Sequence, residues 1–418
     1  MQRNKLAKAI QTEANEHSPH PAASPRPETL VPALLGWFSK NARDLPWRRT
    51  RDPYAIWVSE IMLQQTQVKT VIPYWDRWMH QLPSIQSLAE APSEQIHKLW
   101  EGLGYYTRVR NLQKAAQRLC AEHGGRLPQT FDEVLALPGI GRYTAGAICS
   151  MAFDQPTPIL DGNVMRVLAR LYGLTKDPRE NPTNPRLWHL ARQLVETAAL
   201  LPRNSARATP CSHLNQSLME LGALICTPRQ PRCEICPVQA WCLAFRTGQV
   251  EAIPNLGRRV RSTARRFVAW VAEARGRFLV RQRRAGLVNA HLWEFPNVEV
   301  TLPPSDLKRA AEAALGFRTG QLRPLCVIKH SITRYRITLE TFQTRLAGRA
   351  PDQGTFGAWL ALEELDALAL TSAHRKILTH LATAYHGKVS RKTNRVGDGV
   401  TRLSFLPLGG RCREEGKK

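Results

Sequence analysis

The segment Leu137–Ala145 reads LPGIGRYTA and lies between two stretches of helical periodicity. Upstream of it, Thr130 with Glu133 three residues later predicts a capping box at the start of the first helix. The proline ends that helix, and Gly139 and Gly141 permit the tight backbone of a hairpin. Such a hairpin leaves backbone N–H groups exposed at the N-terminus of the second helix, where they favour binding of an anion. A Gly-x-Gly alone is also typical of a plain interhelical turn, so the rest of the chain must decide.

The sequence around this hairpin is helical from Leu30 to about Phe245, with apolar residues at three- and four-residue spacing. The clearest helices are predicted over Pro53–Lys69, Ser93–Trp100, Arg108–His123, Phe131–Leu137, Arg142–Phe153 and Gly162–Tyr172. This part of the chain is therefore expected to be mainly α.

Beyond Val250–Arg266, a stretch rich in arginine with Pro254 and Gly257, the pattern changes. Short strands are predicted over Arg266–Ala272, Arg277–Gln282, Leu325–Ile328 and Tyr335–Gln343, and helices over Ser305–Leu315 and Ala361–Leu370. The mixture predicts an α+β domain. We expect a disordered leader (1–28), a helical domain (29–250), a linker (251–265), the α+β domain (266–386) and a basic flexible tail (387–418).

The composition indicates a polyanionic partner. The chain has 418 residues, and its 59 Lys and Arg against 34 Asp and Glu give a formal net charge of +25. Such a surplus favours phosphate-rich ligands, because neutralising phosphates releases condensed counterions. Charge alone leaves DNA, RNA and an anionic membrane open. The polar N-terminus lacks the apolar core of a signal peptide, so we expect a cytoplasmic protein.

Four of the nine cysteines, Cys226, Cys233, Cys236 and Cys242, follow the spacing C-x6-C-x2-C-x5-C. Four thiolates suit either a tetrahedral Zn²⁺ or a [4Fe–4S] cluster. Zinc sites usually pair cysteines as two close couples, whereas here three crowd together and the fourth stands apart, which favours the cluster. Between the first two ligands two prolines stiffen a loop that carries Arg229 and Arg232, a pair suited to phosphate contact.

Two carboxylates have contrasting predicted environments. Glu60 shares a helix face with Ile56, Trp57 and Leu63, so desolvation is expected to raise its pKa and make it a general acid. Asp161 precedes a helical segment at the N-cap position, where it is expected to stay ionised and point outward. Cleavage of a glycosidic bond needs such a pair, one protonated and one charged. A surface glutamate and a simple helix cap are the alternatives.

Several strings resemble MutY-type adenine DNA glycosylases of the endonuclease III superfamily, from about Leu34 through Ile253. The cysteine spacing and the hairpin resemble the cluster loop and helix–hairpin–helix of that superfamily. The strings closest to the MutY type are WVSEIMLQQTQ (57–67), LDGNVMRV (160–167), LPWR (45–48), GLGYY (102–106) and NQSLMEL (215–221). The resemblance implies a monofunctional glycosylase of base excision repair that hydrolyses the bond to adenine mispaired with 8-oxoguanine or guanine and leaves an abasic site.

The resemblance also implies roles for residues at the reacting centre. Glu60 would protonate the adenine ring and assist water, and Asp161 would stabilise the cation with support from Tyr143 and Asn163. Lyase members of the superfamily carry a lysine where this chain has Tyr143, so strand cleavage through a Schiff base is not expected.

The other implied roles concern DNA. The adenine pocket would be lined by Trp47, Arg48 and Leu63. The lesion base would be contacted by Gln65, Thr66 and Leu103. Tyr105 would insert its ring into the base stack. Gly139, Gly141, Arg229 and Arg232 would contact phosphates. The expected partner is double-stranded DNA with an A:8-oxoguanine or A:G mispair, bound by a monomer near the nucleoid of a bacterium, with no membrane.

The α+β domain resembles the Nudix-like C-terminal domain of MutY proteins through LWEFP (292–296) and TSAHRK (371–376). Where a Nudix hydrolase clusters glutamates to hold Mg²⁺, this chain has only Glu312, so pyrophosphatase activity is not expected. The lesion-reading loop aligns with His330–Arg334. There Thr333 keeps the hydroxyl of the usual serine, whereas Ile332 and Arg334 depart from the pattern, and a plain strand-edge threonine remains an alternative.

Three other functions fit these residues less well. A thymine–guanine mismatch glycosylase of the same fold can share Tyr143 but lacks the glutamate at position 60. A bifunctional lyase requires a lysine in place of Tyr143. A cluster-bearing DNA-binding or redox protein without catalysis is disfavoured by the pair Glu60 and Asp161.

Overall fold

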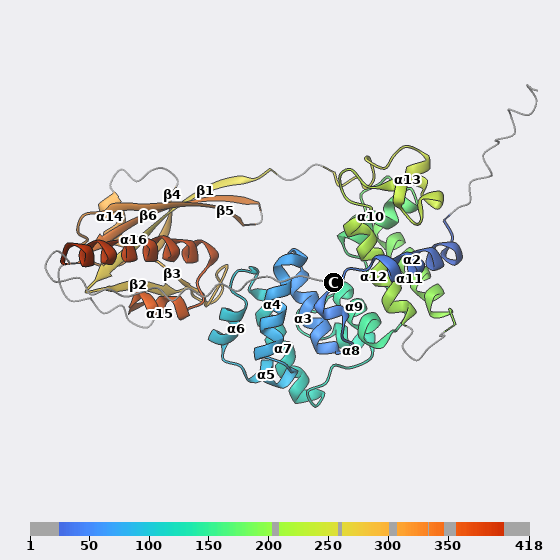
Figure 1. The fold of residues 1–418 in the computed structure, drawn as a ribbon, viewed down its shortest axis with the longest axis horizontal. Coiled ribbons are helices and arrows are strands. Elements are labelled where there is room, and N and C mark those ends of the chain that lie inside the picture. Colours follow the sequence, from blue (N-terminus) through green and yellow to red (C-terminus); the bar gives the residue numbers. More distant parts are fainter. Residues whose placement is uncertain are drawn as a thin grey trace, which may run out of the picture. The chain divides into compact units, whose positions relative to one another are not determined.

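The computed structural model describes residues 25–202, 209–257, 261–300, 307–332, 334–346 and 357–396. Contacts divide the chain into two units. The first consists of the chain up to Arg261 together with the short segment Gly286–Ala290, and the second consists of the remainder. The first unit is helical and the second is built around a sheet (Figure 1), which confirms the predicted fold class. No helix within these ranges combines the length and the apolar character needed to cross a membrane.

The helices of the first unit are α2 (Pro27–Asn41), α3 (Pro53–Leu63), α4 (Val68–Gln81), α5 (Ile85–Glu90), α6 (Ser93–Leu99), α7 (Thr107–Glu122), α8 (Phe131–Leu135), α9 (Arg142–Phe153), α10 (Gly162–Leu171), α11 (Thr183–Ala199), α12 (Pro210–Leu224) and α13 (Leu243–Arg246). One group gathers around α12, which packs against α2, α9, α10 and α11. In the other group α3 packs against α4, α7 and α9. Helix α9 therefore contacts both groups, and side chains on it can meet residues from either (Figure 1).

One predicted helix proved wrong in extent. Instead of a single helix over Pro53–Lys69, α3 ends at Leu63, and α4 begins at Val68. The intervening turn holds Gln65 at a φ of 58°, in the left-handed region. No glycine or proline marks this break in the sequence. Its cause is tertiary, because the guanidinium of Arg108 occupies carbonyl groups at the end of α3 that a continuing helix would use.

The hairpin before α9 requires only one of its two glycines. Gly139 has a φ of +77°, and a Cβ there would lie 2.6 Å from Cβ of Asn111, so both conformation and space demand glycine. Gly141, the N-cap of α9, has an extended backbone with open space around it, so the hairpin depends on the conformational freedom of Gly139 and not on that of Gly141. The capping box is half formed. The Thr130 hydroxyl accepts from the Glu133 backbone N–H, while the Glu133 carboxylate contacts that hydroxyl rather than a backbone N–H.

The second unit is a mixed sheet with strand order β3-β2-β1-β6-β5, in which β4 also pairs with β1 and β7 with β2. The strands are β1 (Thr263–Ala274), β2 (Arg277–Gln282), β3 (Trp293–Glu294), β4 (Asn297–Val300), β5 (Arg323–Ile332), β6 (Tyr335–Arg345) and β7 (Gly357–Leu360). The pair β1–β6 is parallel, and the other strand pairs are antiparallel. The sequence pattern missed the short strands β3, β4 and β7.

Helices cover both faces of this sheet. Alternate residues of β1 point to opposite sides: Val268 and Trp270 pack with helix α14 (Leu307–Leu315), whereas Ala269 and Val271 pack with α15 (Leu362–Ala367) and α16 (Ser372–Val396). Burial on both faces explains why this strand reads as a nearly continuous apolar run.

Element bounds depart from the predicted regions at three places. Helix α2 begins at Pro27, inside the predicted leader, and β1 begins at Thr263, inside the predicted linker. Helix α16 extends to Val396, into the segment that was predicted to be a flexible tail from Gly387.

Candidate active site

Glu60 lies on α3, within a run of nine buried residues. The helix starts at its Asp52 cap, whose carboxylate accepts hydrogen bonds from the N–H groups of Tyr54 and Ala55. Glu60 is 4% exposed. Burial raises its pKa to about 7; a hydrogen bond from Tyr143 opposes this rise, and the charge of Asp161 adds to it. A carboxyl group in this environment holds a proton near neutral pH and can donate it.

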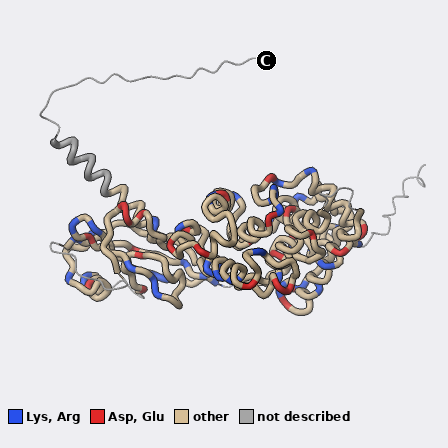
Figure 2. The backbone as a smooth tube through the Cα atoms, turned by 90° about the horizontal axis from the view of Figure 1, so that it is seen from below, with Lys and Arg blue, Asp and Glu red and all other residues tan. Residues whose placement is uncertain are grey.

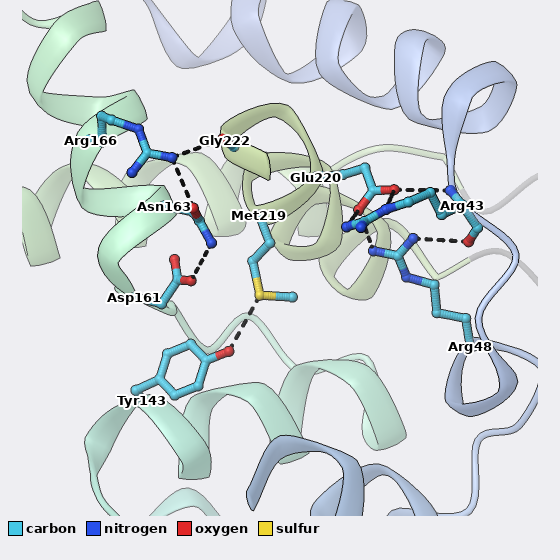
Figure 3. Close-up of polar contacts among 9 residues, drawn as sticks. All are labelled: Arg43, Arg48, Tyr143, Asp161, Asn163, Arg166, Met219, Glu220 and Gly222. Atoms are coloured by element: carbon cyan, nitrogen blue, oxygen red, sulfur yellow. Dashed lines mark hydrogen bonds and ion pairs between the residues drawn. The ribbon is translucent and has the colours of Figure 1, made fainter. Parts of the chain in front are cut away.

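The phenol of Tyr143, in the first turn of α9, connects this acid to α12. Its Oη donates a hydrogen bond to Oε2 of Glu60 at 2.8 Å. The same oxygen lies 3.3 Å from Sδ of Met219 on α12 (Figure 3). Burial, followed by the charges of Glu60 and Asp161, keeps the pKa of Tyr143 well above its ordinary value. The phenol therefore stays protonated and serves as a donor.

Asp161 caps α10 beside this pair. Its Oδ1 accepts from the backbone N–H of Val164 at 2.7 Å. Its Oδ2 accepts from Nδ2 of Asn163 at 3.0 Å (Figure 3). Burial raises the pKa of Asp161 above its ordinary value, although these hydrogen bonds and the charge of Arg166 act to lower it. The prediction of an outward-pointing carboxylate was thus wrong: the group is half-buried and influences the pKa of both Glu60 and Tyr143.

Arg166 links Asn163 to the segment that begins the cysteine loop. Its Nη2 donates to Oδ1 of Asn163 at 2.9 Å and to the carbonyl oxygen of Gly222 at 2.8 Å (Figure 3), while Nε donates to the carbonyl oxygen of Cys226 at 2.8 Å. A Cβ on Gly222 would lie 2.7 Å from Cβ of Asn163. Only a glycine on α12 allows α10 to approach so closely.

A buried ion cluster fixes Arg48, one of the predicted pocket residues. Glu220 on α12 has a side chain with 0% exposure, and its Oε2 accepts from Nη2 of Arg43 at 2.8 Å and from Nη2 of Arg48 at 2.9 Å (Figure 3). Burial acts to raise the pKa of Glu220, but the two arginines more than reverse this and hold it at about 2. Arg48 in turn acts to lower the pKa of Glu60, so the cluster contributes to the electrostatics of the site.

Other predicted DNA-facing residues surround the turn between α3 and α4 and the loop before α7. Trp47 is buried and packs edge-on against Trp75, whereas Leu63 and Thr66 are half-buried and Gln65 is exposed. Leu103 is only 6% exposed, so it presents little surface to a lesion base.

Tyr105 is 45% exposed at a φ of 46°, while its neighbour Tyr106 is buried. The exposed ring is thus available to enter a base stack, and its neighbour belongs to the core. A cavity of about 250 Å³ lies beside it, lined by Gln65, Tyr105, Asn111 and Gly139 among others. The cavity brings the predicted lesion-facing turn, the wedge and the hairpin to one place.

The four cysteines of the tetrad are half-buried and free of disulfides. Burial, and then the neighbouring Cys226, Cys242 and Cys233, raise the pKa of Cys236 to about 12, which shows that the thiols lie close enough to interact. Nη1 of Arg170 donates to Sγ of Cys226 at 3.3 Å, a contact that stabilises a thiolate ligand. Four thiol donors suit zinc or an iron–sulfur cluster. Within the described ranges, no three or more His, Cys, Asp or Glu side chains stand close enough together to hold a metal ion, so the assignment of the tetrad comes from its spacing and donor chemistry.

The two arginines between the first cysteines differ in their contacts. Arg232 donates from Nη2 to the carbonyl oxygen of Leu224 at 2.6 Å and so closes the end of α12. Arg229 is exposed, next to Gln230 at a φ of 48°. Basic residues are found along the backbone of both units (Figure 2), consistent with a polyanionic partner.

In the second unit, the predicted lesion-reading Thr333 lies outside the described residues. Next to it, Tyr335 stacks against the guanidinium groups of Arg265 and Arg334, 4.9 and 5.2 Å from the ring centroid. Glu312 on α14 accepts a hydrogen bond from the backbone N–H of Thr319 at 3.1 Å and thereby shapes the turn after the helix.

Sequence reasoning did not assign a role to Arg43, Arg108, Arg166, Met219 or Glu220. The last two lie in the NQSLMEL string, so that string offered a signal. Arg166 lies in the LDGNVMRV string, which offered a signal as well. Arg43 and Arg108 lie in none of these strings, and the Glu220 carboxylate that Arg43 binds and the α3 carbonyl groups that Arg108 binds are distant in sequence.

Comparison with known proteins gives three family matches: a base excision DNA repair protein of the HhH-GPD superfamily over residues 58–193, the iron–sulfur binding domain of endonuclease III over 226–242, and a NUDIX domain over 267–380. An adenine DNA glycosylase of Rattus norvegicus is 37% identical over 406 residues, which covers 82% of this chain and 76% of the relative. An adenine DNA glycosylase of Buchnera aphidicola subsp. Schizaphis graminum is 41% identical over 214 residues, 51% of this chain and 58% of the relative. A solved thermostable thymine-DNA glycosylase is 30% identical and covers 53% of this chain and 97% of its own, with a TM-score of 0.46.

Proposed function

The chain belongs to the MutY-type adenine DNA glycosylases, and on this premise we propose that it removes adenine mispaired with 8-oxoguanine or guanine and leaves an abasic site. It is a base excision repair glycosylase that acts on adenine in DNA, and it carries a [4Fe–4S] cluster. The observation that supports the proposed mechanism is the buried Glu60, which accepts a hydrogen bond from Tyr143 and whose pKa is raised to about 7 by burial and, to a smaller extent, by the charge of Asp161.

The reaction begins with proton transfer from Glu60 to the ring of the extruded adenine. Protonation allows the bond between C1′ of the sugar and the base to break with the electron pair leaving on adenine. Positive charge then develops on the sugar, and Asp161 stabilises it. Hydrogen bonds from Val164 and Asn163 favour the charged form of that carboxylate.

Water completes the hydrolysis. After proton transfer Glu60 is a carboxylate that accepts a proton from the attacking water as its oxygen bonds to C1′. Glu60 thereby returns to its starting state, so each turnover consumes one water and releases one adenine. Tyr143 offers a phenol of raised pKa at this position instead of an amine, and no covalent imine forms with the sugar.

Recognition of the mispair and contact with the DNA backbone are assigned to residues of the first unit. The exposed ring of Tyr105 enters the base stack as adenine leaves it, which offsets part of the cost of unstacking. Gln65 and Thr66 face the opposing base from the turn after α3, and Trp47, Arg48 and Leu63 line the adenine pocket. The hairpin at Gly139 and the exposed Arg229 contact the DNA backbone.

The second unit is assigned to recognition of 8-oxoguanine through Thr333, which follows β5 in the sequence and precedes β6. Support comes from the NUDIX match and from the arginine-flanked Tyr335 at the start of β6. The cluster, held by Cys226, Cys233, Cys236 and Cys242, anchors the loop that presents Arg229. We place the enzyme as a monomer on the bacterial nucleoid, in the cytoplasm.

The test compares adenine release under single-turnover conditions from duplexes that place adenine opposite 8-oxoguanine, guanine or thymine. We expect the fastest release opposite 8-oxoguanine, slower release opposite guanine and little opposite thymine. Equal rates with all three partners would contradict the proposed mispair specificity. A fourth duplex with a T:G mispair tests the rival function, and release of thymine from it without release of adenine from the others would favour the mismatch glycosylase instead.

A further inference from the structure

One guanidinium connects the two DNA-facing loops of the first unit. Arg108 lies in the first turn of α7, and its Nη1 donates to the carbonyl oxygens of Ile61, Met62 and Gln64 at 2.8, 3.1 and 2.6 Å. These carbonyl groups belong to the end of α3 and to the turn after it, where no further helical N–H follows to satisfy them. The side chain therefore acts as the cap that ends α3 before Gln65.

The other nitrogen of the same fork reaches the loop before α7. Nη2 of Arg108 donates to the carbonyl oxygens of Leu103 and Gly104 at 2.9 and 3.2 Å. Its guanidinium carbon lies 5.2 Å from the ring centroid of Trp100 and 5.7 Å from that of Tyr105. One planar group thus holds both segments at a fixed separation.

In both segments a residue with a strained backbone directly follows a residue whose carbonyl oxygen accepts a hydrogen bond from Arg108. Gln65, after Gln64, has a φ of 58°, and Tyr105, after Gly104, has a φ of 46°. Residues other than glycine rarely adopt this left-handed backbone conformation, and it persists only where the surrounding structure enforces it. The two strained residues are those assigned above to the opposing base and to the stack.

We propose that Arg108 is a positioning residue that sets the lesion-facing turn at Gln65 and the wedge at Tyr105 in register, so that insertion of the wedge and inspection of the opposing base occur together. The inference rests on the proposed function, because it deepens the account of how the mispair is distinguished. Arg108 touches neither the adenine nor Glu60 in this scheme, and it acts through the two backbones that it holds.

Bridging the two loops requires the planar guanidinium of an arginine, whose two terminal nitrogens donate to different loops. A lysine offers a single ammonium group and cannot donate to both loops in one plane. Burial lowers the pKa of Arg108 to about 10, which still leaves the guanidinium charged at neutral pH. Arg108→Lys therefore removes the bridge and keeps the charge.

The experiment compares Arg108→Lys with Arg118→Lys, the same change on the same helix at a residue bonded to Glu122 and to the carbonyl oxygen of Ala136. Adenine release is measured under single-turnover conditions opposite 8-oxoguanine and opposite guanine. We expect Arg108→Lys to lose roughly 10²-fold opposite 8-oxoguanine, the usual effect of a small misplacement, and to lose less opposite guanine. The ratio of the rate opposite 8-oxoguanine to the rate opposite guanine therefore falls in Arg108→Lys, whereas Arg118→Lys is expected to keep both rates at the wild-type values.

This ratio separates positioning from stability, because a smaller folded fraction lowers both rates equally. Should Arg108→Lys not fold, Gly104→Ala replaces it: Gly104 has a φ of +71° and open space around a Cβ, so the change strains the wedge loop without a clash. Gly104→Ala is expected to shrink the same ratio. An unchanged ratio in the variant that folds would overturn the inference. A wild-type enzyme with no preference for 8-oxoguanine would instead overturn the proposed function.

Discussion

The hydroxyl oxygen of Tyr143 lies 2.8 Å from Oε2 of Glu60, and this hydrogen bond joins the first turn of α9 to the buried interior of α3. The contact has two consequences for chemistry. It fixes the direction of the Glu60 carboxyl group, and it acts to lower a pKa that burial would otherwise raise further. The pKa of about 7 is therefore a balance between desolvation and this phenol.

The rate of adenine release should fall as pH rises through neutrality. The protonated form of Glu60 is the acid, so activity is present below its pKa of about 7 and is lost above it. The dependence of kcat/KM on pH is expected to fall about tenfold per pH unit on the alkaline side, with an apparent pKa near that value. A profile that stays flat from pH 6 to about pH 9 would contradict the role of Glu60 as acid.

Tyr143→Phe should move that profile to higher pH. The hydrogen bond from Tyr143 stabilises the Glu60 carboxylate, so its loss leaves the effect of burial less opposed and raises the pKa of Glu60. Tyr172→Phe, at the C-terminal end of α10, is the matched control and should leave the profile in place. A shift of the Tyr143→Phe profile to lower pH would show that the phenol does not stabilise the carboxylate.

Arg229→Ala should weaken the salt dependence of DNA binding. Removing one phosphate contact is expected to reduce the slope of log affinity against log salt by about one, with little dependence on DNA sequence. Arg229 is exposed, so the substitution should leave stability unchanged. Titration of a labelled duplex at several salt concentrations gives the slope, and a slope equal to that of the wild type would remove Arg229 from the interface.

Glu220→Ala should destabilise the first unit. It leaves Arg43 and Arg48 without the carboxylate that pairs them, and loss of one partner of a buried ion cluster costs about 3 kcal/mol. Since the folded pKa of Glu220 is about 2, the stabilisation is present above pH 4.5, its ordinary value, and is lost as pH falls towards 2. Denaturant unfolding of both proteins at neutral and acidic pH should show the difference shrink in acid, and a difference independent of pH would argue against the ion cluster as its source.

The sequence was sufficient for features that depend on local spacing. The Gly139 turn, the caps at Thr130 and Asp161 and the buried position of Glu60 follow from neighbours within a few residues. The cysteine spacing likewise predicted the cluster loop. Identification of the family needed longer strings, because a Gly-x-Gly turn or a lone glutamate is common in unrelated helical proteins.

Features created by tertiary contacts could not be predicted in this way. The break in the predicted helix over Pro53–Lys69 depends on Arg108, more than forty residues downstream of the carbonyl groups it holds. The pairing of Arg48 with Glu220 spans 172 positions. Asp161 was expected to point outward from the N-cap of α10, but it is half-buried and acts on the pKa of Glu60 and Tyr143, which lie on α3 and α9.

The most direct test of the account is single-turnover release of adenine by Glu60→Gln from a saturating duplex that places adenine opposite 8-oxoguanine. Glutamine keeps the shape of the side chain and cannot donate the proton, so the rate should fall roughly 10²- to 10⁴-fold while the Kd for the duplex stays close to that of the wild type. A variant that binds the duplex and releases adenine at the wild-type rate would contradict the claim that the buried Glu60 is the acid of this enzyme.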